Sequence, residues 1–166
     1  SQDTYERLLA RLQGRGVRAV VDATRDLLVN VLPYHPFLIK PNNHELSRLT
    51  GRTLETADGL LAAAREMIAG GVERVVVSMG GDGALFVSKD AAYRAEGLKV
   101  PVGSTVGAGD SMVAALAFAA EQGMSEEDTV RLAVATSAAN VMCSGSQAAE
   151  RSAVDELLPR VVFHKL

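Results

Sequence analysis

Two glycines, an alanine and an aspartate stand together at Gly107, Ala108, Gly109 and Asp110, just before the apolar run 112–120. The glycines let the backbone turn tightly and expose successive N–H groups, and a helix is expected to begin near Asp110. Unpaired N–H groups and the positive end of a helix dipole together form a pocket for an anion. The carboxylate of Asp110 would lie at the rim of that pocket. This combination suits phosphate transfer, in which a carboxylate takes the proton of an attacking hydroxyl.

Three further groups of polar residues follow predicted strands. Residues 22–25, 40–45 and 78–83 come directly after, or at the end of, apolar stretches at 17–22, 37–40 and 73–78. In α/β sheets, ligands bind beyond the carboxyl ends of the strands. We therefore expect the three groups to lie at one edge of a sheet. Residues 107–110 would join them if the following helix packs on the same sheet.

Each group also has a plain structural interpretation. Asn42 and Glu45, three residues apart after Pro41, equally suit the start of a helix. The glycines of residues 80–83 equally suit a turn that enters a hairpin. Two common nucleotide patterns are absent, because no P-loop occurs and Met112 stands where a dinucleotide motif needs glycine or alanine.

The elements that must position these residues follow from the spacing of the apolar side chains. Nearly all-apolar strands alternate with helices, which predicts a mostly parallel α/β sheet covered on both faces. Two short strands at 84–87 and 92–95, around a polar turn, predict a hairpin at the sheet edge. Ser125 with Asp128, and Ser152 with Asp155, are predicted to cap the last two helices. The other predicted helices are 5–12, 43–49, 56–69 and one from about 110 to 122, and the helix that Ser125 caps is predicted to end near 143.

The composition narrows the class of protein. The 166 residues suit one domain with a core of aliphatic side chains, since 48% are hydrophobic but only 4% aromatic. A formal charge of −3 with scattered basic residues indicates neither a nucleic-acid partner nor a membrane surface. The single cysteine, Cys143, excludes an internal disulfide and is expected to be a buried small hydrophobe. We expect a cytoplasmic protein.

Taken together, the motifs resemble those of one family. Residues 105–114 resemble the C-terminal signature of the PfkB carbohydrate kinases, which have the ribokinase fold. Residues 40–46 are similar to the Asn-x-x-Glu motif of that family, and residues 78–84 resemble its nucleotide-binding turn. The order and spacing of the motifs match over essentially the whole chain. The resemblance implies a three-layer α/β/α fold, with residues 1–166 forming part of a single ribokinase-like domain.

The resemblance also implies a role for each matching residue in phosphate transfer. Asp110 would be the general base that takes the proton from a sugar hydroxyl as it attacks the γ-phosphate of ATP. The charge on the transferred group would be stabilised by the N–H groups of Gly107, Ala108, Gly109 and Asp110. Mg²⁺ and its waters would be organised by Asn42 and Glu45.

The remaining implied roles concern the nucleotide and a second cation. The nucleotide would be held by Ser78, Met79, Gly80, Gly81, Asp82 and Gly83, with Val134 and Ala138 near the adenine. A monovalent cation such as K⁺ would bind the carbonyl groups of Ser104, Val106, Asn140, Cys143 and Gly145. Two departures from the family pattern, Ala115 in place of glycine and the turn 144–146, leave this chemistry intact.

The resemblance covers roughly the C-terminal half of a family member, in its phosphosugar branch. The 1-phosphofructokinases are the most similar members, and the tagatose-6-phosphate kinases come next. The other half would carry the first strands, the lid and the basic residues that hold the sugar phosphate. The full-length enzyme is expected to phosphorylate fructose 1-phosphate to fructose 1,6-bisphosphate. The alternatives are another sugar kinase of the family, acting on tagatose 6-phosphate or fructose 6-phosphate, and a nucleotide-binding fragment without catalysis.

The chain lacks an initiator methionine, which fits processing as well as a fragment. Without the first strands of the sheet, we expect an apolar sheet edge and apolar helix faces to be exposed. Such surfaces favour self-association or a homodimer.

Overall fold

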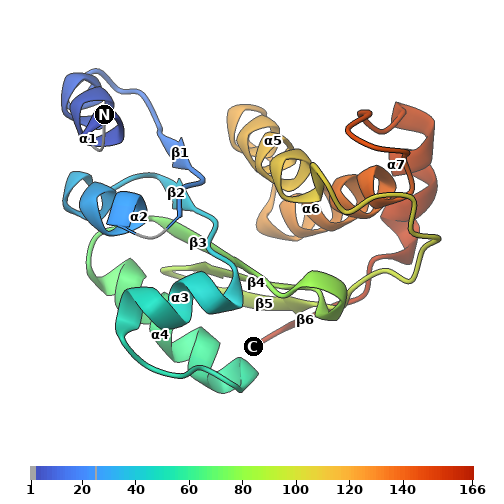
Figure 1. The fold of residues 1–166 in the computed structure, drawn as a ribbon, viewed down its shortest axis with the longest axis horizontal. Coiled ribbons are helices and arrows are strands. Elements are labelled where there is room, and N and C mark those ends of the chain that lie inside the picture. Colours follow the sequence, from blue (N-terminus) through green and yellow to red (C-terminus); the bar gives the residue numbers. More distant parts are fainter. Residues whose placement is uncertain (1–2, 25) are drawn as a thin grey trace. The chain divides into compact units, whose positions relative to one another are not determined.

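The computed structural model describes residues 3–24 and 26–166, which fold as two compact units. The first unit holds the chain up to Met79 together with Leu85–Ala92, and the second holds Gly80–Ala84 and Tyr93–Leu166. Six strands are hydrogen-bonded in the order β1-β2-β3-β4-β5-β6 (Figure 1). This is the α/β class that the sequence predicts. Arg25, at the end of the predicted segment 22–25, lies outside the described residues, and the assignment of 1–166 to a single domain stays a prediction.

The first unit is built on parallel strands joined by helices. Its strands β1 (Val20–Val21), β2 (Leu38–Ile39) and β3 (Arg74–Ser78) pair in parallel, β1 with β2 and β2 with β3. Two helices, α3 (Asn43–Thr50) and α4 (Ala57–Ala69), connect β2 to β3 and pack against β3. Helix α1 (Thr4–Leu12) packs against α2 (Asp26–Val31), which is followed by a 3₁₀ turn at Leu32–Tyr34. The parallel arrangement confirms the prediction from alternating strands and helices.

The core of the first unit is aliphatic, as the composition indicates. Val75 and Val77 of β3 are fully buried, as is Ile39 of β2, and they pack with Leu46 of α3 and Ala64 of α4. The strands β1 and β2 are shorter than predicted. They pair over a short stretch, in which Leu38 N donates to Ala19 O at 3.2 Å and Lys40 N donates to Val21 O at 3.3 Å.

Strands β4 (Ala84–Ser88) and β5 (Ala92–Ala95) form the predicted hairpin. Its turn is closed by Ser88 N, which donates to Ala91 O at 2.9 Å. A strand that the sequence did not indicate, β6 (Phe163–Lys165), pairs antiparallel with β5 and takes the last position in the sheet, so β6, and not the predicted hairpin, forms this edge of the sheet. The rings of Phe163 and Tyr93 meet edge to face, with their centroids 5.8 Å apart.

The second unit is mainly helical. Helices α5 (Ala108–Glu121) and α6 (Glu126–Val141) pack side by side, and α7 (Arg151–Leu157) packs against α6 (Figure 1). Short 3₁₀ turns lie at Gly80–Asp82 and Leu158–Arg160. Many buried residues of α5 and α6 are alanines, among them Ala115, Ala119, Ala133 and Ala135. Small side chains allow two helix backbones to approach closely, so the alanines favour this pairing.

The two predicted helix caps have different outcomes. Ser125 caps α6, since its Oγ accepts from Asp128 N at 3.1 Å and donates to Asp128 Oδ2 at 2.8 Å. The prediction for α7 is wrong. That helix begins at Arg151 after Glu150, no side chain caps it, and Asp155 pairs with Arg151 instead, with Oδ1 2.9 Å from Nε. Asp155 therefore takes part in an i,i+4 ion pair within the helix and not in a cap.

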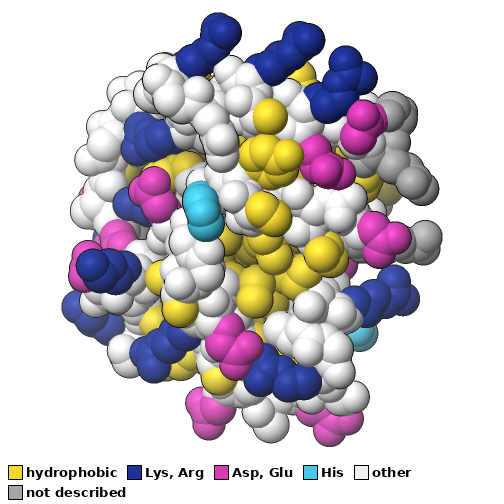
Figure 2. All heavy atoms as spheres, turned by 90° about the vertical axis from the view of Figure 1, so that its left-hand side faces the viewer, with side chains coloured by type: hydrophobic (Ala, Val, Ile, Leu, Met, Phe, Trp, Pro, Cys, Tyr) yellow, Lys and Arg dark blue, Asp and Glu magenta, His cyan; other side chains and the backbone are white. Residues whose placement is uncertain are grey.

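The surface of the first unit includes exposed apolar residues. Figure 2 shows hydrophobic side chains gathered on the face that carries the N-terminal elements. Large exposed residues of this unit include Tyr5, Leu8, Val17 and Val29. Among the residues that the structure describes, strand β1 stands at the end of the sheet and pairs only with β2, as an edge strand does. No helix within the described residues is long and apolar enough to cross a membrane.

Candidate active site

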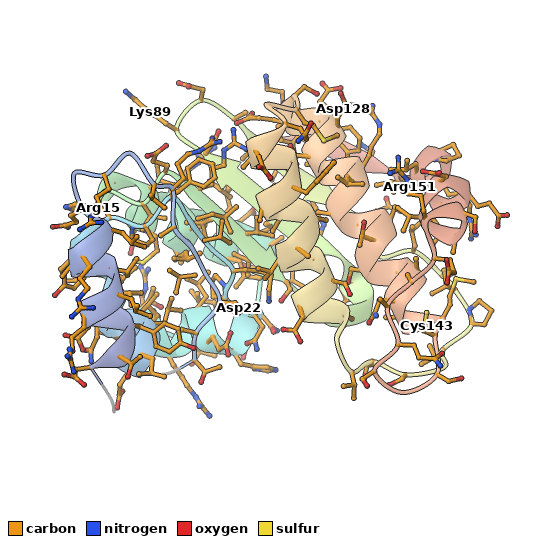
Figure 3. The ribbon with its side chains drawn as sticks, turned by 90° about the horizontal axis from the view of Figure 1, so that it is seen from above. Arg15, Asp22, Lys89, Asp128, Cys143 and Arg151 are labelled. Carbon is orange, nitrogen blue, oxygen red and sulfur yellow. The ribbon has the colours of Figure 1, made fainter. Side chains whose placement is uncertain are left out.

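In the first unit, the carboxyl ends of the three parallel strands meet. Ser78 N, at the end of β3, donates to Pro41 O at 3.0 Å, and Asn42 forms a parallel bridge with Ser78. Just after β1 and β2, Asp22 (labelled in Figure 3) pairs with Lys40, with Oδ2 3.4 Å from Nζ. The prediction that residues after these strands lie at one edge of the sheet is therefore confirmed for Asp22, Lys40, Asn42 and Ser78.

Asn42 and Glu45 form a reciprocal capping box at the start of α3. Asn42 Oδ1 accepts from Glu45 N at 2.8 Å, and Glu45 Oε2 accepts from Asn42 N at 2.9 Å. Two N–H groups that would otherwise lack partners at the helix start are thus satisfied. The helix-start interpretation of these residues is confirmed. Their role toward Mg²⁺ stays a prediction, and the second carboxylate oxygen of Glu45 takes no part in the box.

Lys40 is a buried charged residue that the sequence analysis did not select as a site residue. Its side chain is 7% exposed, whereas that of Asp22 is 31% exposed. A buried ammonium needs a compensating charge, and Asp22 supplies it. The signal in the sequence was the position of Lys40 at the end of a predicted strand, directly before the Asn-x-x-Glu motif.

Of the predicted nucleotide turn, Ser78 and Met79 belong to the first unit, and residues 80–83 belong to the second. In the second unit this turn packs closely on another backbone segment. Gly83 has φ of 96°, and a Cβ there would collide with the carbonyl oxygen of Ala95. A Cβ at Gly97 would likewise collide with Gly81 O. The glycines at 83 and 97 are therefore required by close backbone approach.

The start of α5 has the geometry expected of an anion pocket. Gly107 is the N-cap with φ of 85°, and Ala108, Gly109 and Asp110 form the first turn. The N–H groups of a first turn have no acceptor within the helix, and the dipole makes this end positive. The helix begins two residues before the predicted start, so Asp110 lies inside the first turn, where its side chain is exposed to solvent.

The loop before α5 is hydrogen-bonded to the end of α6. Gly103 N and Ser104 N both donate to Val141 O, at 2.8 and 3.1 Å. A Cβ at Gly103 would lie 2.5 Å from Cys143 O, so the two segments are in close backbone contact. The structure thus brings together the segments that carry all five predicted carbonyl ligands of a monovalent cation, which are Ser104, Val106, Asn140, Cys143 and Gly145.

Asn140 presents an oxygen that has no hydrogen-bond partner. Its side chain is buried at 3% exposure, and Nδ2 donates to Gln147 O at 2.9 Å. Oδ1 is buried and accepts no hydrogen bond. A Cβ built on Gly107 would lie 3.3 Å from this oxygen. The sequence pointed only to the backbone carbonyl of Asn140, although an amide directly after two alanines near the end of a predicted helix was the signal for its side chain.

The other predicted site residues of α6 are buried or half-buried. Val134 and Ala138 are 4% and 8% exposed, and their contact with an adenine ring stays a prediction. Cys143 lies in the turn that follows α6 (Figure 3) and is half-buried, less than the expected buried side chain. Its Sγ lies 3.5 Å from Ala139 O, to which it donates.

The open α/β sheet of this chain matches solved structures that have the ribokinase-like fold. Residues 1–153 match the model of the pfkB family of carbohydrate kinases, and the chain belongs to that family. It is 36% identical over 162 residues to the 1-phosphofructokinase of Haemophilus influenzae, covering 97% of this chain and 52% of that protein.

Solved structures agree with this assignment. The phosphofructokinase-2 of Escherichia coli in complex with substrates and products superposes with a TM-score of 0.91 at 33% identity, over 96% of this chain and 52% of that chain. The same enzyme in complex with potassium gives a TM-score of 0.90, at the same identity and coverage. The chain therefore spans about half the length of the relatives that it matches.

Proposed function

We propose that this chain supplies the ATP site, the anion pocket and the general base of a kinase that phosphorylates a hydroxyl of a sugar phosphate. The observation that carries the proposal is the first turn of α5, where the left-handed Gly107 and the exposed Asp110 stand within four residues of each other. One short segment thus offers both N–H donors for a phosphoryl group and a carboxylate for the attacking hydroxyl.

The chemistry assigned to each residue follows from this placement. Asp110 accepts the proton of the sugar hydroxyl while the hydroxyl oxygen forms a bond to the γ-phosphorus of ATP. The bond from that phosphorus to the β-phosphate oxygen breaks, which releases ADP. The N–H groups of Ala108, Gly109 and Asp110 donate to the oxygens of the group in transfer. Because these donors are fixed by the helix before the reaction begins, they stabilise the developing charge without reorganisation.

The residues in the first unit suit Mg²⁺. Glu45 retains one carboxylate oxygen outside the capping box, and hard cations prefer oxygen ligands. Within the described part of the chain, no group of three or more His, Cys, Asp or Glu residues could hold a metal alone. Phosphate oxygens and waters would therefore complete the coordination. When bound, Mg²⁺ neutralises negative charge on the phosphates.

The second unit suits a monovalent cation. The loop 103–106 and the turn after α6 are in backbone contact, which brings carbonyl oxygens of two segments into one region. The potassium complex of the Escherichia coli relative supports K⁺ as the ion. When bound, K⁺ supplies positive charge behind the anion pocket.

Replacement of Asp110 tests the proposed function. In the native gene product at its full length, Asp110→Asn is expected to lower kcat about 10²–10⁴-fold, because the proton acceptor is lost, while ATP still binds. Asp128→Asn is a matched control, since Asp128 is also the third residue of its helix and is exposed. Near-normal kcat for Asp110→Asn, with stability equal to that of the control, would remove Asp110 from the mechanism.

The substrate is proposed to be fructose 1-phosphate, which the 1-phosphofructokinase from Haemophilus influenzae supports. The alternatives are tagatose 6-phosphate and fructose 6-phosphate, and the complex of the Escherichia coli phosphofructokinase-2 with fructose-6-phosphate supports the latter. Initial rates of the native gene product on all three sugar phosphates decide between them. The site of ATP-dependent sugar phosphorylation would be the cytoplasm.

A second candidate is a nucleotide-binding protein without catalysis. The exposed apolar residues on the first unit suit self-association of such a chain. Thermal stabilisation of the 166-residue chain by ATP without ADP formation would support this candidate, and measurable sugar phosphorylation by the same chain would refute it.

A further inference from the structure

Asn140 lies between the end of α6 and the turn that starts α5. One end of its carboxamide is fixed, because Nδ2 donates to Gln147 O at 2.9 Å. That bond also sets the orientation of the amide, so Oδ1 points the other way, toward Gly107. The side chain is 97% buried, with 3% exposed. A fixed, buried carboxamide therefore faces the glycine that begins the proposed anion pocket.

Two groups that face each other here, the Oδ1 of Asn140 and the N–H of Gly107, both lack a hydrogen-bond partner within the described residues 26–166. Oδ1 of Asn140 has no hydrogen-bond partner. Within residues 26–166, Gly107 N–H likewise has no acceptor. A buried polar group without a partner is destabilising, and native structures rarely keep one without a reason. A small rotation of the peptide between Val106 and Gly107 would allow the two groups to pair.

The surroundings favour movement of the turn over movement of Asn140. Asn140 is in the last turn of a 16-residue helix and is held by Gln147 O. The turn is held more weakly at its end, where Ala108 N donates to Thr105 O at 3.4 Å, a long bond. Val106 is exposed, so its peptide can rotate without displacing packed side chains. The turn is therefore the element that can adjust.

We propose that Asn140 is a positioning residue for the anion pocket, and that its Oδ1 accepts a hydrogen bond from Gly107 N–H when an anion occupies the N-terminus of α5. The proposal rests on the proposed function, because it gives the pocket a phosphoryl group to bind. The anion accepts hydrogen bonds from the N–H groups of Ala108, Gly109 and Asp110. The turn that precedes them closes onto Asn140, which takes the N–H of Gly107 in place of the anion. The side chain of Asn140 thereby fixes the donors relative to Asp110.

Hydrogen exchange of the Gly107 amide tests the proposal directly. In the ¹⁵N-labelled native gene product, exchange of this amide is expected to slow about tenfold or more on addition of Mg²⁺·ADP and inorganic phosphate. Asn140→Leu, which keeps the branched shape of the side chain and removes the acceptor, is expected to abolish the slowing. Thr129→Val is the matched control, because it removes another buried polar group of α6, whose Oγ1 donates to Ser125 O at 2.8 Å.

Kinetics provide the second measurement. Asn140→Leu is expected to lower kcat about 10–100-fold while the KM for ATP changes less than about threefold, because a misplaced donor is felt most in the transition state. Thr129→Val is expected to lower the melting temperature without changing either constant. A loss of stability alone would affect both variants, so the split between kcat and KM identifies positioning.

The outcomes separate this proposal from the proposed function. Unchanged exchange of Gly107 in the unsubstituted protein would overturn it without any variant. Slowing by KCl alone would also overturn it, since Oδ1 would then be a cation ligand. If Asp110→Asn abolishes turnover but Asn140→Leu matches the unsubstituted protein, the proposed function stands and the role of Asn140 is refuted. If Asp110→Asn keeps turnover while Gly107 exchange still depends on phosphate and Asn140, the proposed function fails and the positioning role stands.

Discussion

Gly107→Ala is the substitution whose effect the structure defines best. Gly107 has φ of 85°, which a residue with a Cβ adopts at a cost of about 1–2 kcal/mol. The new Cβ would also lie 3.3 Å from Asn140 Oδ1, which is a tight contact. Asn140 is buried and held by Gln147, so relief requires an unfavourable rotamer at about 0.5–1.5 kcal/mol. We expect the free energy of unfolding to fall by about 1.5–3.5 kcal/mol in total.

Gly123→Ala separates the two contributions. Gly123 has φ of 63°, but a Cβ there would have no atom within 4 Å. This control therefore carries the backbone cost alone, about 1–2 kcal/mol. Urea unfolding of both variants, with equal m-values, measures the difference, which we expect to be about 1 kcal/mol. Binding of ATP is expected to weaken for Gly107→Ala and to stay unchanged for Gly123→Ala.

Two results would refute this reasoning. Equal unfolding free energies for the two variants, within about 0.5 kcal/mol, would show that Asn140 does not constrain Gly107. Unchanged ATP binding by Gly107→Ala would show that the turn before α5 does not shape the nucleotide site. Addition of Asn140→Ala to Gly107→Ala removes the crowding oxygen, so a double-mutant cycle is expected to give a favourable interaction between the two substitutions.

Three further predictions concern stability. Asp22→Asn leaves the buried Lys40 without a compensating charge and is expected to lower the free energy of unfolding by about 1–3 kcal/mol. This loss is expected to exceed that of Lys40→Met, and similar losses for both variants in urea unfolding would contradict the reasoning. Asn42→Ala removes the cap of α3 at a cost of about 1 kcal/mol, whereas Asn42→Asp keeps it, and a melting curve that does not distinguish them would argue against the capping box. Ser125→Ala is expected to cost about 1 kcal/mol through α6 without changing ATP affinity in titration calorimetry, and a weakened affinity would count against a purely structural cap.

The sequence was most informative where the signal is local. The spacing of the apolar residues predicted the bounds of α4 and β3 closely. The predicted range of α4 began at Thr56, which is the N-cap of that helix in the structure. The spacing of Asn42 and Glu45 predicted a helix start, because a capping box depends only on two residues that lie three positions apart. The glycines at 107 and 109 predicted a turn and a helix start for the same reason.

The sequence was less informative where distant partners decide. Strand β6 is three residues long and is defined by pairing with β5, from Ala95↔Phe163 to Tyr93↔Lys165. Helix α2 is short and contains valines, so propensity alone does not indicate it. The side chain of Asn140 was not selected because its importance comes from Gly107, which lies 33 residues earlier in the chain. Sequence spacing carries no information about such a contact.

The capping box of α3 also affects how a cation would be bound. A free glutamate side chain loses about 1.5–2 kcal/mol of rotamer entropy when a ligand orders it. The side chain of Glu45 is already ordered by its bond to Asn42 N–H, so this loss occurs when the chain folds. Association with a cation would then require little further ordering of the carboxylate, which favours affinity in the way that a rigid ligand does. The same bond that starts a helix therefore makes its third residue a preorganised ligand.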